Sequence, residues 1–206
     1  MTTRTLLSDD ARRARWCDTF GAHEDSIIVY NDLSTRMSED GRHYHTMEHV
    51  DEMLTLADDA GLTSPITDAA IWFHDAVYEA GSKHNEDLSA ELAERFMPRM
   101  GLDAAAQATV IAMILASKAH RSKDPAIMPF LDLDMAILGA KPERYRRYAA
   151  DVRQEFAHMS DWSFRMGRKH FLKGCLRRKQ LYLTPWFRER FEAQARENIK
   201  AEIEGM

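Results

Sequence analysis

The sequence predicts an all-α protein of about eight or nine helices. Residues that favour helices, namely alanine, leucine, methionine, glutamate and arginine, are abundant, whereas runs that alternate apolar and polar residues are scarce. The chain contains no internal repeat and no long linker. Its 206 residues match the size of one ordinary domain. We therefore expect a single domain over residues 1–206, in which the helices from about residue 142 pack on the core.

Capping and helix-breaking residues mark the expected boundaries. Thr46 is a good N-cap for a helix that runs to about Ala60 and ends at Gly61. Pro65 suits the first turn of the following helix. The later expected elements are a helix from Asn85 to Met100 ended by Gly101, a helix capped by Asp103, a loop from Asp124 to Pro129, an apolar segment from Phe130 to Leu138, and two or three helices after Pro142, the last of them from Pro185.

The composition argues against several classes of function. A net charge of −5 disfavours general binding to nucleic acid backbones, which calls for a basic surface. The chain has no run of about 18 apolar residues, and its N-terminus lacks the apolar stretch of a signal peptide, so we expect no membrane segment. The two cysteines, Cys17 and Cys175, cannot supply a disulfide framework. These features together predict a cytoplasmic protein.

The first chemical feature is the His74-Asp75 pair, which follows the apolar run at residues 69–73. Burying an imidazole and an ionised carboxylate at the end of an apolar helix costs free energy, unless a partner offsets the loss of their contacts with water. A divalent cation would do so, because histidine nitrogen and aspartate oxygen bind manganese, zinc, iron, nickel and, with further oxygen ligands, magnesium. Taken alone, the pair also fits a core histidine beside a solvated aspartate.

A second feature is the spacing of His45 and His49, which lie four residues apart. On a helix, side chains at this spacing share one face and converge. Taken alone, the segment also fits a polar helix start with solvated histidines. The metalloprotease signature contains a similar histidine pair, but it places glutamate directly after the first histidine, where this chain has Thr46. The sequence therefore argues against a metalloprotease.

Together with a later aspartate in an apolar segment, these features resemble the HD superfamily of metal-dependent phosphohydrolases, whose signature is a histidine, a His-Asp pair and a distant aspartate. From about Trp16 to Glu202 the chain is similar to one bacterial family of predicted HD phosphohydrolases with no assigned substrate. The segments that carry this likeness are Arg42–His45, Ala70–Asp75, Asn85-Glu86 with Ser89-Ala90, and Phe130–Gly139. The resemblance implies a single HD-type helical domain.

The resemblance also implies roles for the histidines. His74 and Asp75 match the central ligand pair of the superfamily. The segment Tyr44–Val50 is similar to one in cyclic nucleotide phosphodiesterases, where the second histidine binds metal and the first donates a proton to the leaving group. That likeness assigns His49 to the metal and His45 to general acid, a role that suits the reference pKa of histidine, about 6.5. The reverse assignment, or metal binding by both histidines, stays open.

Asp132 and Asp134 are the two candidates for the last ligand. Two residues apart on a helix, they point about 200° apart, so a regular helix cannot direct both at one ion. In HD enzymes with this Asp-x-Asp arrangement the second aspartate is the ligand, and Asp134 falls beside Leu131 and Leu138 on the apolar side. We therefore expect Asp134 to bind the metal, and Asp132 to cap its helix or reach water.

The activity that the resemblance implies is metal-dependent hydrolysis of a phosphoester or phosphoanhydride, in a nucleotide or another small phosphorylated metabolite. Asp75 or Asp134 would also orient the attacking water. Arg42, Lys118 and His120 would hold the phosphate, and Glu86 would face the pocket through water. Two alternatives from other classes stay open: a di-iron oxygenase of HD-like fold, and a metal-binding regulatory domain without turnover. A homodimer is open as well.

Overall fold

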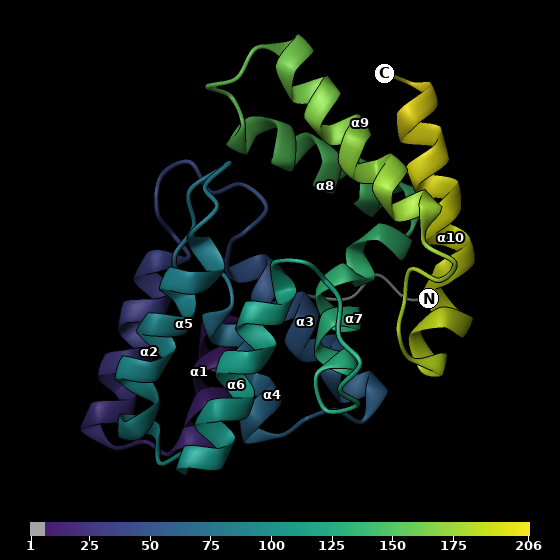
Figure 1. Ribbon diagram of the computed structural model, residues 1–206. Coiled ribbons are helices and arrows are strands. Elements are labelled where there is room, and N and C mark those ends of the chain that lie inside the picture. Colours follow the sequence, from purple (N-terminus) through teal and green to yellow (C-terminus); the bar gives the residue numbers. More distant parts are fainter. Residues whose placement is uncertain (1–6) are drawn as a thin grey trace.

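The computed structural model describes residues 7–206, and over this range it contains ten α-helices, two short 3₁₀ helices and no strand (Figure 1). In chain order the elements are α1 (Asp9–Phe20), α2 (Glu24–Arg36), α3 (Met47–Ala60), α4 (Pro65–Phe73), α5 (Asn85–Phe96), η1 (Met97–Met100), α6 (Ala104–Ser117), α7 (Met128–Met135), η2 (Ala136–Gly139), α8 (Pro142–Glu155), α9 (Asp161–Arg177) and α10 (Pro185–Glu204). The predicted all-α class is confirmed, and the helix count exceeds the expected eight or nine.

The N-terminal region shows why helices are easily undercounted in the sequence. Only three residues separate α1 from α2, and Gly21 makes the turn between them with φ at 83°. Ser8 caps α1, and the ring of His23 caps α2 by accepting from the backbone N–H of Ser26. A break this short between two charged helices is difficult to see in a hydropathy pattern.

Most of the helix starts predicted from caps and prolines are confirmed. Thr46 and Asp103 accept hydrogen bonds from the first turns of α3 and α6, and Ser64, which was not predicted as a cap, does so for α4. Pro65 and Pro185 are the first residues of α4 and α10. Gly61 ends α3 in the left-handed region, with φ at 67°.

Two predicted boundaries are wrong, both near prolines. The helix expected from Asn85 to Met100 ends at Phe96 and continues as the 3₁₀ helix η1, because Pro98 has no N–H to donate and its ring disfavours α-helical backbone before it. The loop expected up to Pro129 ends earlier, since α7 begins at Met128 with Pro129 in its first turn.

The centre of the molecule is α4. All five residues from Ala69 to Phe73 are fully buried. This helix packs against α1, α3, α5, α6 and α7, so apolar side chains are needed around its whole circumference. The His74-Asp75 pair therefore leaves α4 at a point that other helices surround.

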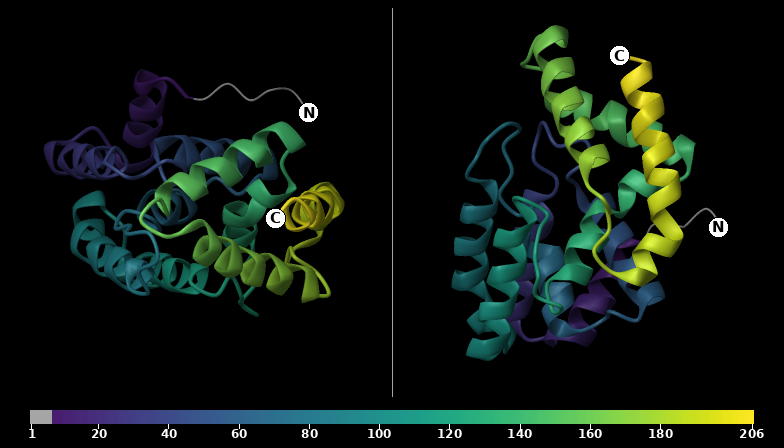
Figure 2. Two further views of the ribbon diagram at one scale, coloured as in Figure 1. Left: turned by 90° about the horizontal axis from the view of Figure 1, so that it is seen from above. Right: turned by 45° about the vertical axis from the view of Figure 1, so that its right-hand side comes forward.

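The helices α8, α9 and α10 form the C-terminal part of the structure, where α9 and α10 run side by side (Figure 2). The predicted packing on the core occurs through η2, which contacts both α8 and α10. Gly139 permits the close approach of α10, because a Cβ atom there would lie 2.7 Å from the backbone oxygen of Phe191. The buried apolar side chains form one cluster with members from all ten α-helices.

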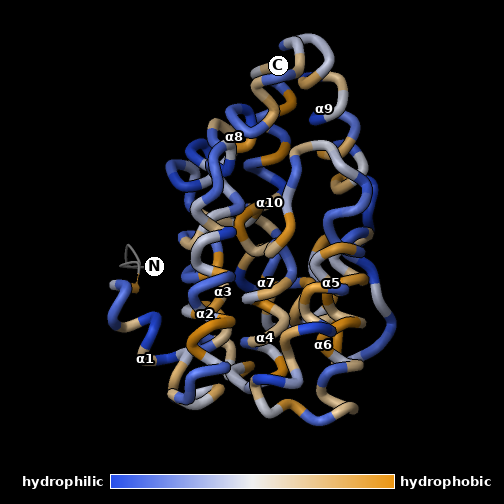
Figure 3. The backbone as a smooth tube through the Cα atoms, turned by 90° about the vertical axis from the view of Figure 1, so that its left-hand side faces the viewer, coloured by the Kyte–Doolittle hydropathy of each residue, from blue (hydrophilic) through white to orange (hydrophobic). Residues whose placement is uncertain are grey.

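Apolar and polar residues follow one another along most of the helices, as burial of one side requires (Figure 3). Among the helices of residues 7–206, none combines the length and the apolar character of a transmembrane segment.

Two buried ion pairs fix α1 to the helices that carry the candidate site. The guanidinium of Arg12 donates twice to the Asp51 carboxylate on α3, with both distances at 2.8 Å. The guanidinium of Arg15 donates to both oxygens of Asp68 on α4, at 2.9 and 3.0 Å. Both carboxylates are buried, and removing their charges from water costs free energy. The two-point contacts with the guanidinium groups offset this cost.

Replacing Arg15 with alanine should lower the free energy of unfolding by about 3–5 kcal/mol, because it leaves the buried Asp68 carboxylate unpaired. The matched control is Arg13→Ala, which removes an exposed arginine from the same helix and should stay within about 0.5 kcal/mol of the parent. Urea titrations followed by circular dichroism measure both values. Equal stabilities of the two variants would contradict the anchoring role of the pair.

Candidate metal centre

Four side chains from three elements meet at the end of α4. His49 comes from α3, His74 and Asp75 follow α4, and Asp134 comes from α7. The Nε2 atoms of the two histidines lie 3.3 Å apart. Asp75 Oδ2 lies 2.9 Å from Nε2 of His74 and 3.9 Å from that of His49, and Asp134 Oδ1 lies 3.5 Å from Nε2 of His49 and 3.8 Å from that of His74. These four residues are called the cluster below.

The spacing of these atoms fits a divalent metal ion. Bonds of about 2.1 Å at right or tetrahedral angles place neighbouring ligand atoms roughly 3.0–3.5 Å apart. Single ligand atoms of His49, His74 and Asp134 all lie within 4.8 Å of one another. Asp75 lies outside this mutual set, although its carboxylate contacts His74. The arrangement can therefore hold an ion with three close ligands and Asp75 at one side.

Both histidine rings are held by their other nitrogen. His74 Nδ1 donates to the backbone oxygen of Ile71 at 2.9 Å, and His49 Nδ1 lies 3.0 Å from the hydroxyl of Tyr44. These contacts fix the ring orientations and leave both Nε2 atoms facing the centre of the cluster. Metal-binding histidines in proteins are commonly held in this way.

The electrostatics of the cluster favour a positive charge. Burial alone would lower the pKa of His74, but the carboxylates of Asp75 and Asp134 outweigh it and raise the pKa to about 9. Burial would raise the pKa of Asp75, yet the neighbouring His74 and His45 lower it below its usual range. The two carboxylates thus stabilise a cation between the histidines, whether a proton or a metal ion.

His120 is the residue that approaches Asp134 from the far side. Its Nε2 lies 2.7 Å from Asp134 Oδ2, the oxygen that faces away from His49. His120 has φ at +47°, a conformation that residues other than glycine rarely adopt. Arg178 donates to the backbone oxygens of Ala119 and His120 and so stabilises this turn. The structure therefore brings His120 to the cluster, where it contacts the Asp134 carboxylate, and its role in holding phosphate stays a prediction.

His45 lies beside the cluster and is held by Glu155 from α8. Its Nδ1 is 2.7 Å from Glu155 Oε2, and its ring stacks on Tyr78, whose hydroxyl donates to the same oxygen. Glu155 Oε1 accepts from the backbone N–H groups of His43, Tyr44 and His45. Burial would raise the pKa of Glu155, but the hydrogen bond and the charge of the His45 ring, together with the backbone N–H groups of His45 and His43, lower it to about 2. An ionised Glu155 therefore orients His45 and the loop that carries it.

Burial alone would lower the pKa of His45. The carboxylates of Asp75 and Glu155 outweigh this effect, so the pKa of His45 is raised from its ordinary value. His45 remains partly exposed, with 22% of its side chain accessible, whereas His49 is buried. A partly exposed imidazole with a raised pKa, next to a ligand cluster, is suited to donating a proton.

Arg42 is not free to bind a phosphate, contrary to the prediction. Its guanidinium is buried and donates to the backbone oxygens of His45, Asp75 and Ala76, and to the carboxylate of Glu39. These contacts join the His45 loop to the segment after α4. Arg42 therefore positions the cluster and does not offer its charge to a ligand.

Lys118 and Glu86 lie together at the start of α5. Lys118 Nζ is 2.6 Å from Asp87 and 3.9 Å from Glu86. This ion pair includes no cluster residue, so no contact supports the predicted roles of Lys118 and Glu86 in holding substrate.

Asp132 points away from the cluster, as helix geometry requires, but its predicted surroundings are wrong. It neither reaches water nor caps α7, since it is buried. Its two oxygens accept from the backbone N–H groups of Leu183 and Thr184 and from the Thr184 hydroxyl, all at 2.7 Å. Asp132 therefore holds the turn that begins α10.

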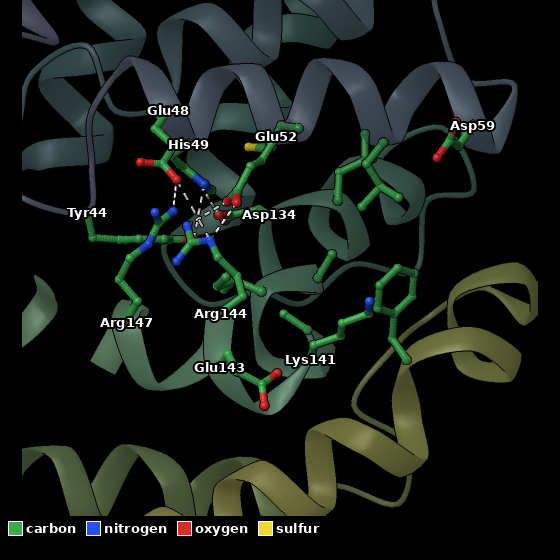
Figure 4. Close-up of a pocket in the computed structure, with 17 residues that line it drawn as sticks. Tyr44, Glu48, His49, Glu52, Asp59, Asp134, Lys141, Glu143, Arg144 and Arg147 are labelled. Carbon is green, nitrogen blue, oxygen red and sulfur yellow. Dashed lines mark hydrogen bonds and ion pairs between the residues drawn. The ribbon is translucent and has the colours of Figure 1, made fainter. Parts of the chain in front are cut away.

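An open groove of about 730 Å³ starts at the His49 and Asp134 side of the cluster (Figure 4). Arg144 and Arg147 of α8 reach across it to glutamates of α3: Arg144 donates to both oxygens of Glu52 and Arg147 pairs with Glu48. Neither arginine was predicted to be a site residue from the sequence, and nor were Tyr44, Tyr78 and Glu155. Of these residues, only Tyr44 could have been found from the sequence, because it lies in the segment Tyr44–Val50 that is similar to cyclic nucleotide phosphodiesterases.

Asp134→Asn should reduce bound metal per chain, because it removes a charged ligand from the cluster. Asp132→Asn should keep the metal but lower the free energy of unfolding by about 1–3 kcal/mol, since its amide nitrogen cannot accept from the N–H groups at the start of α10. Elemental analysis and urea titration of both variants check this. If Asp132→Asn lost the metal and Asp134→Asn retained it, Asp132 and not Asp134 would be the metal-binding aspartate.

Three comparisons with known proteins were made, against protein-family models, curated proteins and solved structures, and none gave a match. The geometry of the cluster and its surroundings therefore carries the functional conclusion.

Proposed function

We propose that this chain is a metal-dependent phosphohydrolase with an HD-type helical fold. One observation carries the proposal: where α3, α4 and α7 meet, two imidazole Nε2 atoms lie 3.3 Å apart, and each of two aspartate carboxylates has an oxygen within 3.9 Å of both of them. The order of these residues along the chain, histidine, His-Asp and distant aspartate, agrees with the HD signature. The substrate class is a small phosphoester or phosphoanhydride.

A divalent ion, when bound, supplies Lewis-acid activation of a phosphoryl oxygen and of water. The protein residues supply position and proton transfer. His49, His74 and Asp134 hold the ion, and Asp75, with 18% of its side chain exposed, orients the attacking water. His45 donates a proton to the leaving oxygen.

Glu155 sets both the position and the protonation of His45. Its carboxylate fixes the ring through Nδ1, which leaves Nε2 as the nitrogen that exchanges a proton. The negative charge also stabilises the imidazolium form. The same division of labour, in which a buried carboxylate orients a histidine, is common among enzymes that use histidine as an acid or base.

The metal requirement is tested by His49→Ala and His74→Ala. Each variant should lose most of its bound metal and its phosphoesterase activity, because each lacks one of the two nitrogen ligands. The protein as purified, and each variant, should be analysed for metal per chain and then screened with nucleotides and small phosphoesters. Full metal retention in either variant would refute the ligand assignment, and two irons per chain would favour the oxygenase alternative.

The proton-transfer role is tested by His45→Ala and Glu155→Gln. His45→Ala should retain its metal but lose turnover by roughly 10²–10⁴-fold. Asp75 and Glu155 both raise the pKa of His45, and Glu155→Gln removes one of these two charges, so the imidazolium form is lost at lower pH. The alkaline limb of the pH profile of kcat should therefore move to lower pH. An unmoved limb would show that His45 is not the titrating acid, and metal loss in His45→Ala would make it a ligand.

A further inference from the structure

The groove beside the cluster has a defined length and direction. It follows α3 from His49 to Asp59, ten positions further along the helix, which corresponds to about 15 Å along the axis. Figure 4 shows His49, Asp134 and Arg144 together at one end, with Lys141 and Asp59 well away from them. A ligand that touches the cluster can therefore extend along the groove.

The middle of the groove is aliphatic. Met53 and Leu56 of α3 line it together with Leu133 of α7 and Ile137 of η2, and the aromatic residues among its described lining are Tyr44 and Phe191. Among residues 7–206, the side chains that line the groove include no serine, threonine, asparagine or glutamine. A nucleobase is usually recognised by stacking between aromatic rings and by hydrogen bonds to its edges. The lining favours a saturated chain over a base.

The cluster end of the groove offers a donor that has no acceptor. Arg144 uses Nε and Nη2 to hold Glu52, whereas its Nη1 is buried and, over residues 7–206, has no hydrogen-bond partner. The guanidinium lies over the ring of Tyr44, whose hydroxyl holds His49. A buried donor without a partner costs free energy that an anionic oxygen beside the cluster would recover.

We infer that the groove binds an alkyl phosphate, with its phosphate at the cluster and Arg144 Nη1, and its aliphatic chain along α3 against Ile137. This inference names the substrate class of the proposed phosphohydrolase and rests on that proposal for turnover. Binding of the ligand's aliphatic chain depends on the groove and not on turnover. It can therefore be measured separately from catalysis.

The test is isothermal titration of the protein as purified, with its metal content determined, against methylphosphonate, butylphosphonate, octylphosphonate and AMP. These alkylphosphonates cannot be hydrolysed at their carbon–phosphorus bond under these conditions. Affinity should rise about fourfold for each added methylene that enters the groove. AMP should bind no better than butylphosphonate.

Variants locate the binding site. Ile137→Asn should weaken octylphosphonate on the order of tenfold and leave methylphosphonate unchanged, whereas Ile111→Asn, at a similarly half-buried position on α6 outside the groove, should affect neither. Arg144→Met should weaken all alkylphosphonates to a similar degree, and Arg146→Met, which removes an exposed arginine of α8, should not.

Equal affinities for methylphosphonate and octylphosphonate, or an unchanged octylphosphonate affinity in Ile137→Asn, would overturn the inference even if the protein hydrolyses phosphoesters. AMP binding tighter than octylphosphonate would overturn it as well, in favour of a nucleotide. Chain-length-dependent binding without any phosphoesterase activity would support the groove assignment and count against the proposed hydrolysis alone.

Discussion

The burial of α4 is the constraint on which the rest of the site depends. A helix that is apolar on every side must be surrounded, and five other helices surround this one. His74 and Asp75 follow directly after its C-terminal end, so they lie between the surrounding helices, where His74 is buried and Asp75 is mostly buried. Polar groups there need partners, and the partners come from the neighbouring helices, as His49 from α3 and Asp134 from α7.

The second consequence is that each of the two histidine rings is fixed from outside the cluster. Tyr44 and the backbone of Ile71 hold the two rings, and Arg42 joins the loop before α3 to the segment after α4. Glu155 adds a tie from α8, since its carboxylate accepts three backbone N–H groups of that loop. The C-terminal helices therefore contribute to the site directly, through Glu155 and the arginines beside the groove.

Features that depend on local sequence were predictable, and those that depend on distant contacts were not. The caps of α3, α4 and α6 follow from side chains within a few residues, and the choice of Asp134 over Asp132 follows from helix geometry and the HD resemblance. The contact of Glu155 with His45 joins residues 110 positions apart, and Asp132 finds its partners 51 and 52 positions later. No periodicity marks such pairs, so Arg42 looked like a free cation and Asp132 like an exposed cap.

We propose that His49, His74 and Asp134 together bind one divalent ion. Anomalous diffraction from crystals of the protein grown with manganese tests it most directly, because the metal is located without reference to activity. One strong peak per chain is expected, about 2.0–2.2 Å from Nε2 of both histidines and from an oxygen of Asp134. A cluster without such a peak, in which the two Nε2 atoms share a proton while manganese binds elsewhere, would contradict it.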